Sequence, residues 1–390
     1  MTAPFVPHHP LARAAGPGRR LAAVALATSA ATAALVAFFA ARPDVNPFLE
    51  VDNTLGRTLL PGPLLTAILL ATALLGVATA AAALARGTAR AAEGVVAPVA
   101  VLQVVAFGFL AQGFGTLSVA GYIVALTVPV LAVWAGAQVF RTRPPWRIPL
   151  ALAGVAAVVG IVVARHDFAI WLGRVASGFA RERWGILAVL LPLATAAAWA
   201  GLALVRAWRR GSLRRATTWV TRHRRLFTIL AALGPLPYAL ARLTWLTPWP
   251  QLGDAELLTL ATKIQGLALS SGAWAGIILT LGLILPWGER FPRWFPRRAG
   301  QPVPPAAAIV PGGIVAVMLC GAAIPMLLMM GWLGAVYFPA WFWGPTLALA
   351  VWGYAGHRAG VGAPEAGAPE VGAGDVNAGA PAPPAPAARR

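Results

Sequence analysis

Apolar residues occupy this chain in long uninterrupted runs that short polar stretches separate. Most runs are close to the roughly 20 residues that an α-helix needs to cross about 30 Å of bilayer hydrocarbon. We therefore expect an all-α, polytopic transmembrane helical bundle of about ten spans. These lie at about 21–41, 63–85, 95–113, 118–140, 148–164, 185–205, 226–246, 266–286, 306–331 and 338–356.

The third and fourth spans are the hardest to separate, because no charge interrupts the chain from Val95 to Phe140. That stretch is too long for one crossing, and Gly113, Gly115 and Ser118 indicate a turn inside it. We predict two spans here. The first span has an alternative interpretation as the apolar region of a signal peptide, although its length argues against cleavage.

The composition agrees with a membrane protein. Of 390 residues, 59% are hydrophobic and only 11% are charged, against about a quarter in a typical soluble domain. The net charge of +19 comes from arginine, since Lys263 is the sole lysine. These arginines lie in short loops between apolar runs, which is typical of membrane orientation signals and argues against nucleic-acid binding. The single cysteine, Cys320, excludes an intrachain disulfide and a cysteine-based metal cage.

The distribution of basic residues predicts the orientation. With the N-terminus in the cytoplasm, cytoplasmic segments hold 23 of the 31 Lys and Arg residues. Positive charge accumulates on the cytoplasmic side of membrane proteins, so we predict N-in and C-in topology in the plasma membrane. One outer loop, 165–184, dissents because it carries four arginines.

Polar and low-complexity segments flank the membrane domain, which we place at 21–356. Residues 1–20 form a basic, Pro-rich arm, and residues 357–390 are dominated by Ala, Gly and Pro with GAPE occurring twice. Such a composition cannot bury a core, so we expect the second segment to be a disordered cytoplasmic tail.

The most basic stretch is 206–225, which holds eight arginines in twenty residues. It is either a plain loop that sets the topology or one helix lying in the inner interface, with a partner-docking site as a further alternative. As a helix it would present Trp208, Leu213, Ala216, Trp219 and Val220 on one apolar face. The residues expected to contact anionic lipid headgroups are Arg209, Arg210, Arg214, Arg215, Arg222, Arg224 and Arg225.

The seventh span is the strongest candidate for a substrate site. Pro235 and Pro237 lie near its middle and should kink or break the helix, because each removes a backbone donor. Arg242 follows one turn before the outer end, where it binds a substrate or extends toward the interface. The candidate substrate residues are Pro235, Pro237, Tyr238 and Arg242, with Asp254 and Glu256 in the next loop as charge partners or as a helix N-cap.

The outer loop 165–184 contains a second amphipathic pattern. Phe168, Leu172, Val175 and Phe179 repeat at helical spacing. They predict a surface helix that caps the bundle. The alternative is a lid over a substrate entrance, with His166 and Asp167 as its polar rim.

The loop 286–305 is rich in proline and arginine, and its Trp287 and Trp294 suit the membrane interface. We expect the prolines to hold it extended and stiff. Its sequence WGERFPRWFP, followed by GQPVPP and IVPGG, resembles a segment of uncharacterised multi-spanning membrane proteins from GC-rich, actinobacterial-type genomes. The resemblance implies a group of relatives without any known activity.

Several chemical motifs are absent from the sequence. Lys263 follows Thr262, so no nucleotide-binding P-loop exists, and neither Gly-x-Ser-x-Gly nor His-Glu-x-x-His occurs. The five histidines lie outside the expected spans. We therefore expect no catalytic residue, metal or cofactor, and the sequence names no protein partner.

Three functional hypotheses remain open. Ten spans and the broken seventh helix favour a transporter or permease for a small solute, although no internal repeat supports the five-plus-five carrier architecture. A second is a non-catalytic scaffold or sensor that docks partners through the arginine-rich loops. The third is a lipid-modifying or glycosyl-transferring enzyme that uses Asp44, Glu50 and Asp52 of the first outer loop.

Overall fold

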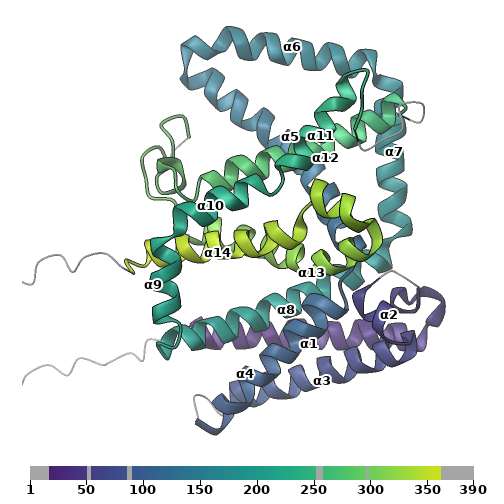
Figure 1. Cartoon of the computed structure of the whole chain (residues 1–390), viewed down its shortest axis with the longest axis vertical. Helices are drawn as coiled ribbons and strands as arrows, with labels where there is room; N and C mark the ends of the chain where they lie inside the picture. The colour runs from purple at the N-terminus through teal and green to yellow at the C-terminus, as the bar shows by residue number, and fades with distance from the viewer. Residues whose placement is uncertain (1–16, 51–53, 86–89, 252–257, 296–297, 362–390) are drawn as a thin grey trace, which may run out of the picture.

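The chain folds into a bundle of α-helices, which a computed structural model describes for residues 17–50, 54–85, 90–251, 258–295 and 298–361 (Figure 1). Within these ranges the only β-type pairing is one isolated bridge, between Arg290 and Pro302. The helices are α1 Pro17–Ala41, α2 Leu55–Leu59, α3 Gly62–Ala85, α4 Arg90–Val105, α5 Phe114–Thr142, α6 Arg147–Val163, α7 Arg165–Arg181, α8 Arg183–Arg209, α9 Arg214–Arg222, α10 Arg224–Leu233, α11 Leu236–Leu243, α12 Leu260–Leu281, α13 Ala306–Tyr337 and α14 Ala340–Arg358.

Eight segments of the described chain are long and apolar enough to cross a membrane, at 18–41, 62–85, 121–142, 144–163, 183–209, 224–246, 260–281 and 306–328. The expected third span is a shorter apolar helix, Gly94–Leu110, and the expected tenth corresponds to the 19-residue α14. The all-helical fold is therefore confirmed, while ten crossings remain a prediction. Helix breaks also separate the third and fourth segments, since α5 starts only at Phe114.

The helices pack in two groups. In the first, α1, α3, α4 and α8 enclose large side chains such as Phe39, Phe107 and Trp199. Buried polar contacts join these helices, because hydrocarbon offers no other hydrogen-bond partners. Trp199 Nε1 donates to Ser29 Oγ at 2.9 Å, and the hydroxyls of Thr32 and Thr195 lie 2.8 Å apart.

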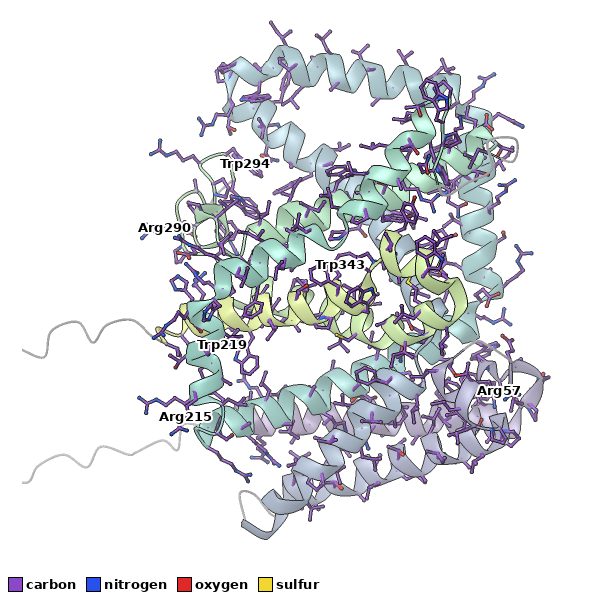
Figure 2. The ribbon with its side chains drawn as sticks, viewed as in Figure 1. Arg57, Arg215, Trp219, Arg290, Trp294 and Trp343 are labelled. Atoms are coloured by element: carbon purple, nitrogen blue, oxygen red, sulfur yellow. The ribbon has the colours of Figure 1, made fainter. Side chains whose placement is uncertain are left out.

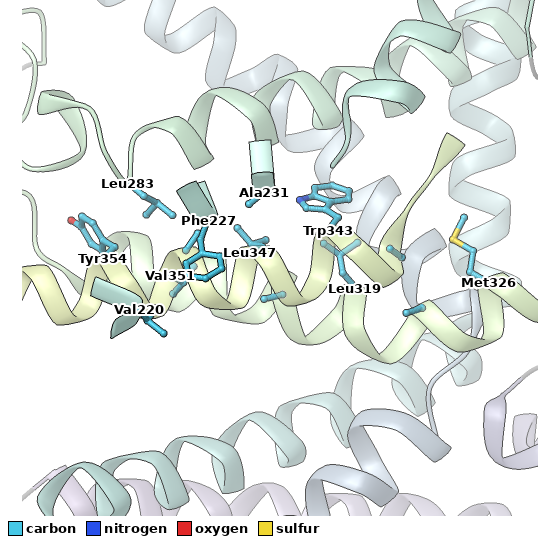
Figure 3. Close-up of a cluster of buried hydrophobic side chains, with 14 residues drawn as sticks. Val220, Phe227, Ala231, Leu283, Leu319, Met326, Trp343, Leu347, Val351 and Tyr354 are labelled. Atoms are coloured by element: carbon cyan, nitrogen blue, oxygen red, sulfur yellow. The ribbon is translucent and has the colours of Figure 1, made fainter. Parts of the chain in front are cut away.

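The second group contains α9 to α14, and its core lies along α14 (Figure 3). Phe227, Leu319, Trp343, Leu347 and Tyr354 are among its larger members. Helices α5 and α13 make the contacts between the two groups. By contrast, α6 contributes no buried residue and lies at the margin of the bundle (Figure 1).

The two ends of the bundle carry different elements (Figures 1 and 2). Residues 17 and 361, helix α9 and the loop 286–305 lie at one end, which we call the arginine-rich end. Helix α7 and the connection 42–61, which includes Arg57, lie at the opposite end. Both described ends of the chain therefore share one side, as an even number of crossings requires. Which side faces the cytoplasm remains a prediction from the arginine count.

The basic stretch 206–225 is not one helix. Helix α8 runs to Arg209, and α9 begins at Arg214. Gly211 breaks the helix between them with φ of +71°, a conformation that residues with a Cβ rarely adopt. The buried face of α9 consists of Thr217 and Val220, whereas Trp219 is 54% exposed. The predicted single apolar face therefore does not form, because the break at Gly211 places Trp208 on α8 and Ala216, Trp219 and Val220 on α9.

The loop 286–305 also differs from its expected extended form. Its two arms pair, with Phe291 N donating to Gln301 O and Val303 N donating to Glu289 O, each at 2.9 Å. Arg358 Nη2 of α14 donates to Val303 O at 2.8 Å. The loop therefore folds back on itself against the end of α14, and backbone pairing outweighs the stiffness of its prolines. The arm 1–16, the tail 362–390 and the predictions made for them lie outside the described residues.

Candidate ligand-binding cavity

The break in the seventh predicted span is confirmed. Helix α10 ends at Leu233 and α11 begins at Leu236, with Gly234 and Pro235 between them and Pro237 in the first turn of α11. The gap in the helix is filled by protein. A Cβ placed on Gly234 would lie 2.5 Å from Trp343 Cγ, so the indole of α14 occupies the space that the missing side chain leaves.

Arg242 lies between two aromatic rings. Its guanidinium carbon is 5.0 Å from the ring centre of Tyr238 and 3.9 Å from that of Trp245. Cations gain roughly 0.5–2 kcal/mol from such ring faces. Arg242 Nε is buried and lacks a hydrogen-bond partner in the described part of the chain.

The structure thus brings Arg242 and Tyr238 together, as the candidate substrate site requires. Their predicted charge partners, Asp254 and Glu256, lie outside the described residues. The sequence interpretation missed Trp245, whose ring packs directly on Gly266 of α12. The sequence did contain a signal: Trp245 lies three residues after Arg242, so in a helix its ring can reach the guanidinium.

A cavity of about 590 Å³ lies elsewhere, at the opposite end of the bundle. Four regions line it: residues 44–50 with Thr54, the start of α5 with the residues just before it, the second half of α7 and the start of α8. This volume is in the range of small-molecule sites. Residues of the acidic first loop and of the amphipathic helix in 165–184 therefore line the same cavity.

Charged groups of both signs line this cavity. Asp44, Glu50 and Glu182 supply carboxylates, while Arg174 and Arg181 supply guanidiniums from α7. Asp44 also accepts two hydrogen bonds from Arg42, each 3.0 Å long, which lower the pKa of its carboxyl below the ordinary value. This carboxylate therefore stays ionised at neutral pH. Asp52, the third acid of the loop, lies outside the described residues.

Aromatic side chains form the rest of the wall. Phe48, Tyr122, Phe179 and Trp184 all line the cavity. The rings of Tyr122 and Phe179 meet edge to face with centroids 6.2 Å apart, so α5 and α7 are in contact at the cavity wall. Charges beside apolar walls suit a ligand that has both polar and apolar parts.

Helix α7 confirms the predicted helix but corrects its buried face. Trp171 and Val175 are its buried residues, whereas Leu172 is 46% exposed. His166 and Asp167, the predicted rim, do not line the cavity; Arg174 and Arg181 occupy that role. The prediction placed Leu172 on the buried face between Phe168 and Val175. Trp171 fits the same helical face equally well, and it is Trp171 that is buried.

Helix α12 lies between the cavity and the Arg242 clamp. Gln265 Nε2 donates to Tyr122 Oη at 2.9 Å, and Tyr122 lines the cavity. The ring of Trp245 packs against Gly266, the next residue of α12. Tyr122 of the cavity wall and Trp245, whose ring lies against Arg242, thus contact neighbouring positions of α12.

The arginine-rich end contains one cluster that is already neutralised. Arg224 Nη1 lies 3.6 Å from Glu289 Oε1, and His357 Nε2 lies 3.1 Å from the same oxygen. Arg224 therefore joins α10 to the loop 286–305 instead of facing solvent. The arginines at 209, 210, 214, 215, 222 and 225 are exposed, as headgroup contacts would require.

Within the described ranges, no group of three or more His, Cys, Asp or Glu residues could hold a metal ion. Comparison with known proteins adds no relative: no family model matches the chain, and no curated protein or solved structure does so.

Proposed function

We propose that this multi-pass membrane protein is a transporter for a small solute with charged and apolar parts. The carrying observation is the cavity at the opposite end, which places carboxylates, guanidiniums and aromatic rings around about 590 Å³. Opposite charges within one cavity favour a zwitterionic or amphipathic solute over a simple ion. On the N-in, C-in topology that we also propose, this cavity faces outward and would admit the solute from outside the cell.

The break between α10 and α11, which lies across α12 from the cavity, also supports transport. Discontinuous helices recur at the moving parts of carriers, because their unpaired backbone groups allow two arrangements. Here the break between α10 and α11 is packed by Trp343, and the Arg242 clamp lies near α12. We propose that solute in the cavity moves Tyr122 and α12, which displaces Trp245 and opens a route beyond it.

Transport is testable in proteoliposomes with a panel of zwitterionic amino acids and short-chain amphiphilic carboxylates. The intact protein should take up at least one of them. Arg174→Gln should reduce that uptake about tenfold or more, because a hydrogen bond to a charged group contributes about 1.5–3 kcal/mol. Arg165→Gln is the matched control, since Arg165 lies on the same helix outside the cavity wall. Equal loss in both variants, or no uptake of any solute, would reject the proposal.

A lipid-modifying or glycosyl-transferring enzyme is the second candidate. It is favoured by Asp44 and Glu50, which come from the first outer loop and both line the cavity. One ionised carboxylate there could accept a proton from an attacking hydroxyl. Asp44→Asn and Glu50→Gln should then abolish turnover of a lipid-linked sugar while leaving its binding intact. Unchanged turnover in both variants would eliminate this candidate.

We propose that the exposed arginines of the arginine-rich end contact anionic headgroups of the cytoplasmic leaflet. Each such arginine contributes about 1 kcal/mol near an anionic surface. Kinship with actinobacterial-type membrane proteins also stands as a proposal, supported by the motifs within residues 287–313 and by the similar many-span layout.

A further inference from the structure

We infer that the start of α1, the end of α8 and the start of α9 form a discrete binding site for an anionic phospholipid. These three segments carry five exposed arginines: Arg19, Arg20, Arg209, Arg214 and Arg215. We call this set the arginine corner. It deepens the proposed headgroup contact by adding α1, which the basic stretch 206–225 does not include.

The contact between α1 and α8 brings these charges together. A Cβ placed on Gly18 would lie 3.7 Å from Arg209 Nη1, so this guanidinium lies beside the residue that precedes Arg19. At Gly211 the chain turns across the end of the bundle, and α9 starts at Arg214 close to the end of α8. Charges that are far apart in sequence thus meet at one place.

No described carboxylate neutralises the arginine corner. The acidic side chains that the structure describes are Asp44, Glu50, Asp167, Glu182 and Glu289. The first four belong to the connection 42–61 and helix α7 at the opposite end, or to the turn beside it (Figure 1). Glu289 is engaged by Arg224 and His357. Among the described side chains the corner therefore keeps a net positive charge, which favours an anion as its ligand.

Helix α9 is held in a position that suits a lipid headgroup. Its buried residues Thr217 and Val220 pack on α14, and Trp352 Nε1 donates to Thr217 Oγ1 at 3.1 Å. Helix α9 consequently runs across the end of the bundle, with Arg215 and Trp219 on its outer side (Figure 2). The position of its arginines is set by packing and does not depend on the ligand.

Apolar surface next to the corner favours a phospholipid over a soluble anion. Leu204 and Trp208 lie one turn apart on α8 and are 52% and 41% exposed. They provide a surface for an acyl chain directly below the guanidiniums, and tryptophan is favoured at this depth. Because several arginines meet here, a lipid with two phosphate groups should bind more tightly than one with a single phosphate.

The test uses the full-length protein in nanodiscs of phosphatidylcholine. These contain either phosphatidylglycerol, which has one phosphate group, or a lipid of the cardiolipin type, which has two separate phosphate groups. Native mass spectrometry then counts the anionic lipids that remain bound. The Arg209→Gln/Arg214→Gln/Arg215→Gln variant should bind the cardiolipin-type lipid at least about tenfold more weakly than the unaltered protein does. Because both leaflets have the same composition, the result does not depend on orientation or on transport activity.

The matched control removes the same number of charges from the same end of the bundle. Arg141, Arg143 and Arg147 lie at the turn between α5 and α6 and are exposed, and their replacement by Gln should leave binding unchanged. Circular dichroism and gel filtration verify that both variants are folded. Equal binding by the two variants, equal retention of phosphatidylcholine, or displacement of the lipid by millimolar inorganic phosphate would overturn the inference.

Discussion

At the scale of single residues, contacts between glycine and tryptophan hold the broken helix closed. Gly234 lies against Trp343 and Gly266 lies against Trp245, so two indoles pack where a Cβ would otherwise stand. Such contacts let helices approach closely, as small residues do in many membrane proteins. The two glycines therefore contribute to packing because they lack a side chain, and their backbone freedom is less important.

Gly234→Ala tests this packing. The added methyl group would lie 2.5 Å from Trp343 Cγ and must displace the ring, so we expect a loss of about 1–3 kcal/mol in the free energy of unfolding. Gly154→Ala is the control, because nothing lies within 4 Å of its added Cβ on α6. That change should be neutral or stabilising by up to about 1 kcal/mol, through helix propensity. Thermal unfolding in detergent measures both, and equal midpoints would contradict the packing argument.

Single residues also show where sequence reasoning succeeded. Pro235 and Pro237 predicted the helix break, because proline removes a backbone donor whatever surrounds it. The partner of that break, Trp343, lies more than a hundred positions later, and no local pattern indicates it. Likewise, the acidic loop and the amphipathic helix were each visible, but their meeting around one cavity depends on packing between distant segments.

At the scale of elements, helix α7 forms one wall of the cavity and needs a firm attachment. Trp171 is only 5% exposed, and α7 as a whole contacts α12. The neighbouring Leu172 faces away from these contacts. The difference between two adjacent apolar residues therefore distinguishes the attached face of α7 from its outer face.

Trp171→Ala should loosen α7, with a loss of about 3–5 kcal/mol, because it empties a buried site. Leu172→Ala should cost less than about 1 kcal/mol, since that side chain is already 46% exposed. Hydrogen exchange of the α7 amides measures the local effect, and the Trp171 variant should exchange faster throughout the helix. Similar exchange in both variants would mean that α7 is held by other contacts.

At the scale of the whole molecule, the sequence predicted the class of the fold from hydrophobic run length alone. It was less successful with elements that lie across the bundle. Helix α9 and the folded loop 286–305 owe their positions to α14, through Trp352 with Thr217 and Arg358 with Val303. Tertiary contacts of this kind override the local preferences of arginine-rich and proline-rich segments.

Cysteine labelling at the two ends of the bundle tests the predicted orientation. Cys320, the single cysteine, is first replaced by Ala, and Arg165→Cys or Arg215→Cys is then introduced at opposite ends. Because basic residues concentrate at the end that contains Arg215, that end should face the cytoplasm. A membrane-impermeant maleimide should label the Arg165→Cys variant in intact cells and the Arg215→Cys variant only after permeabilisation. The reverse pattern would place the cavity in the cytoplasm and the arginine corner outside, and the outward-facing transport model would then fail.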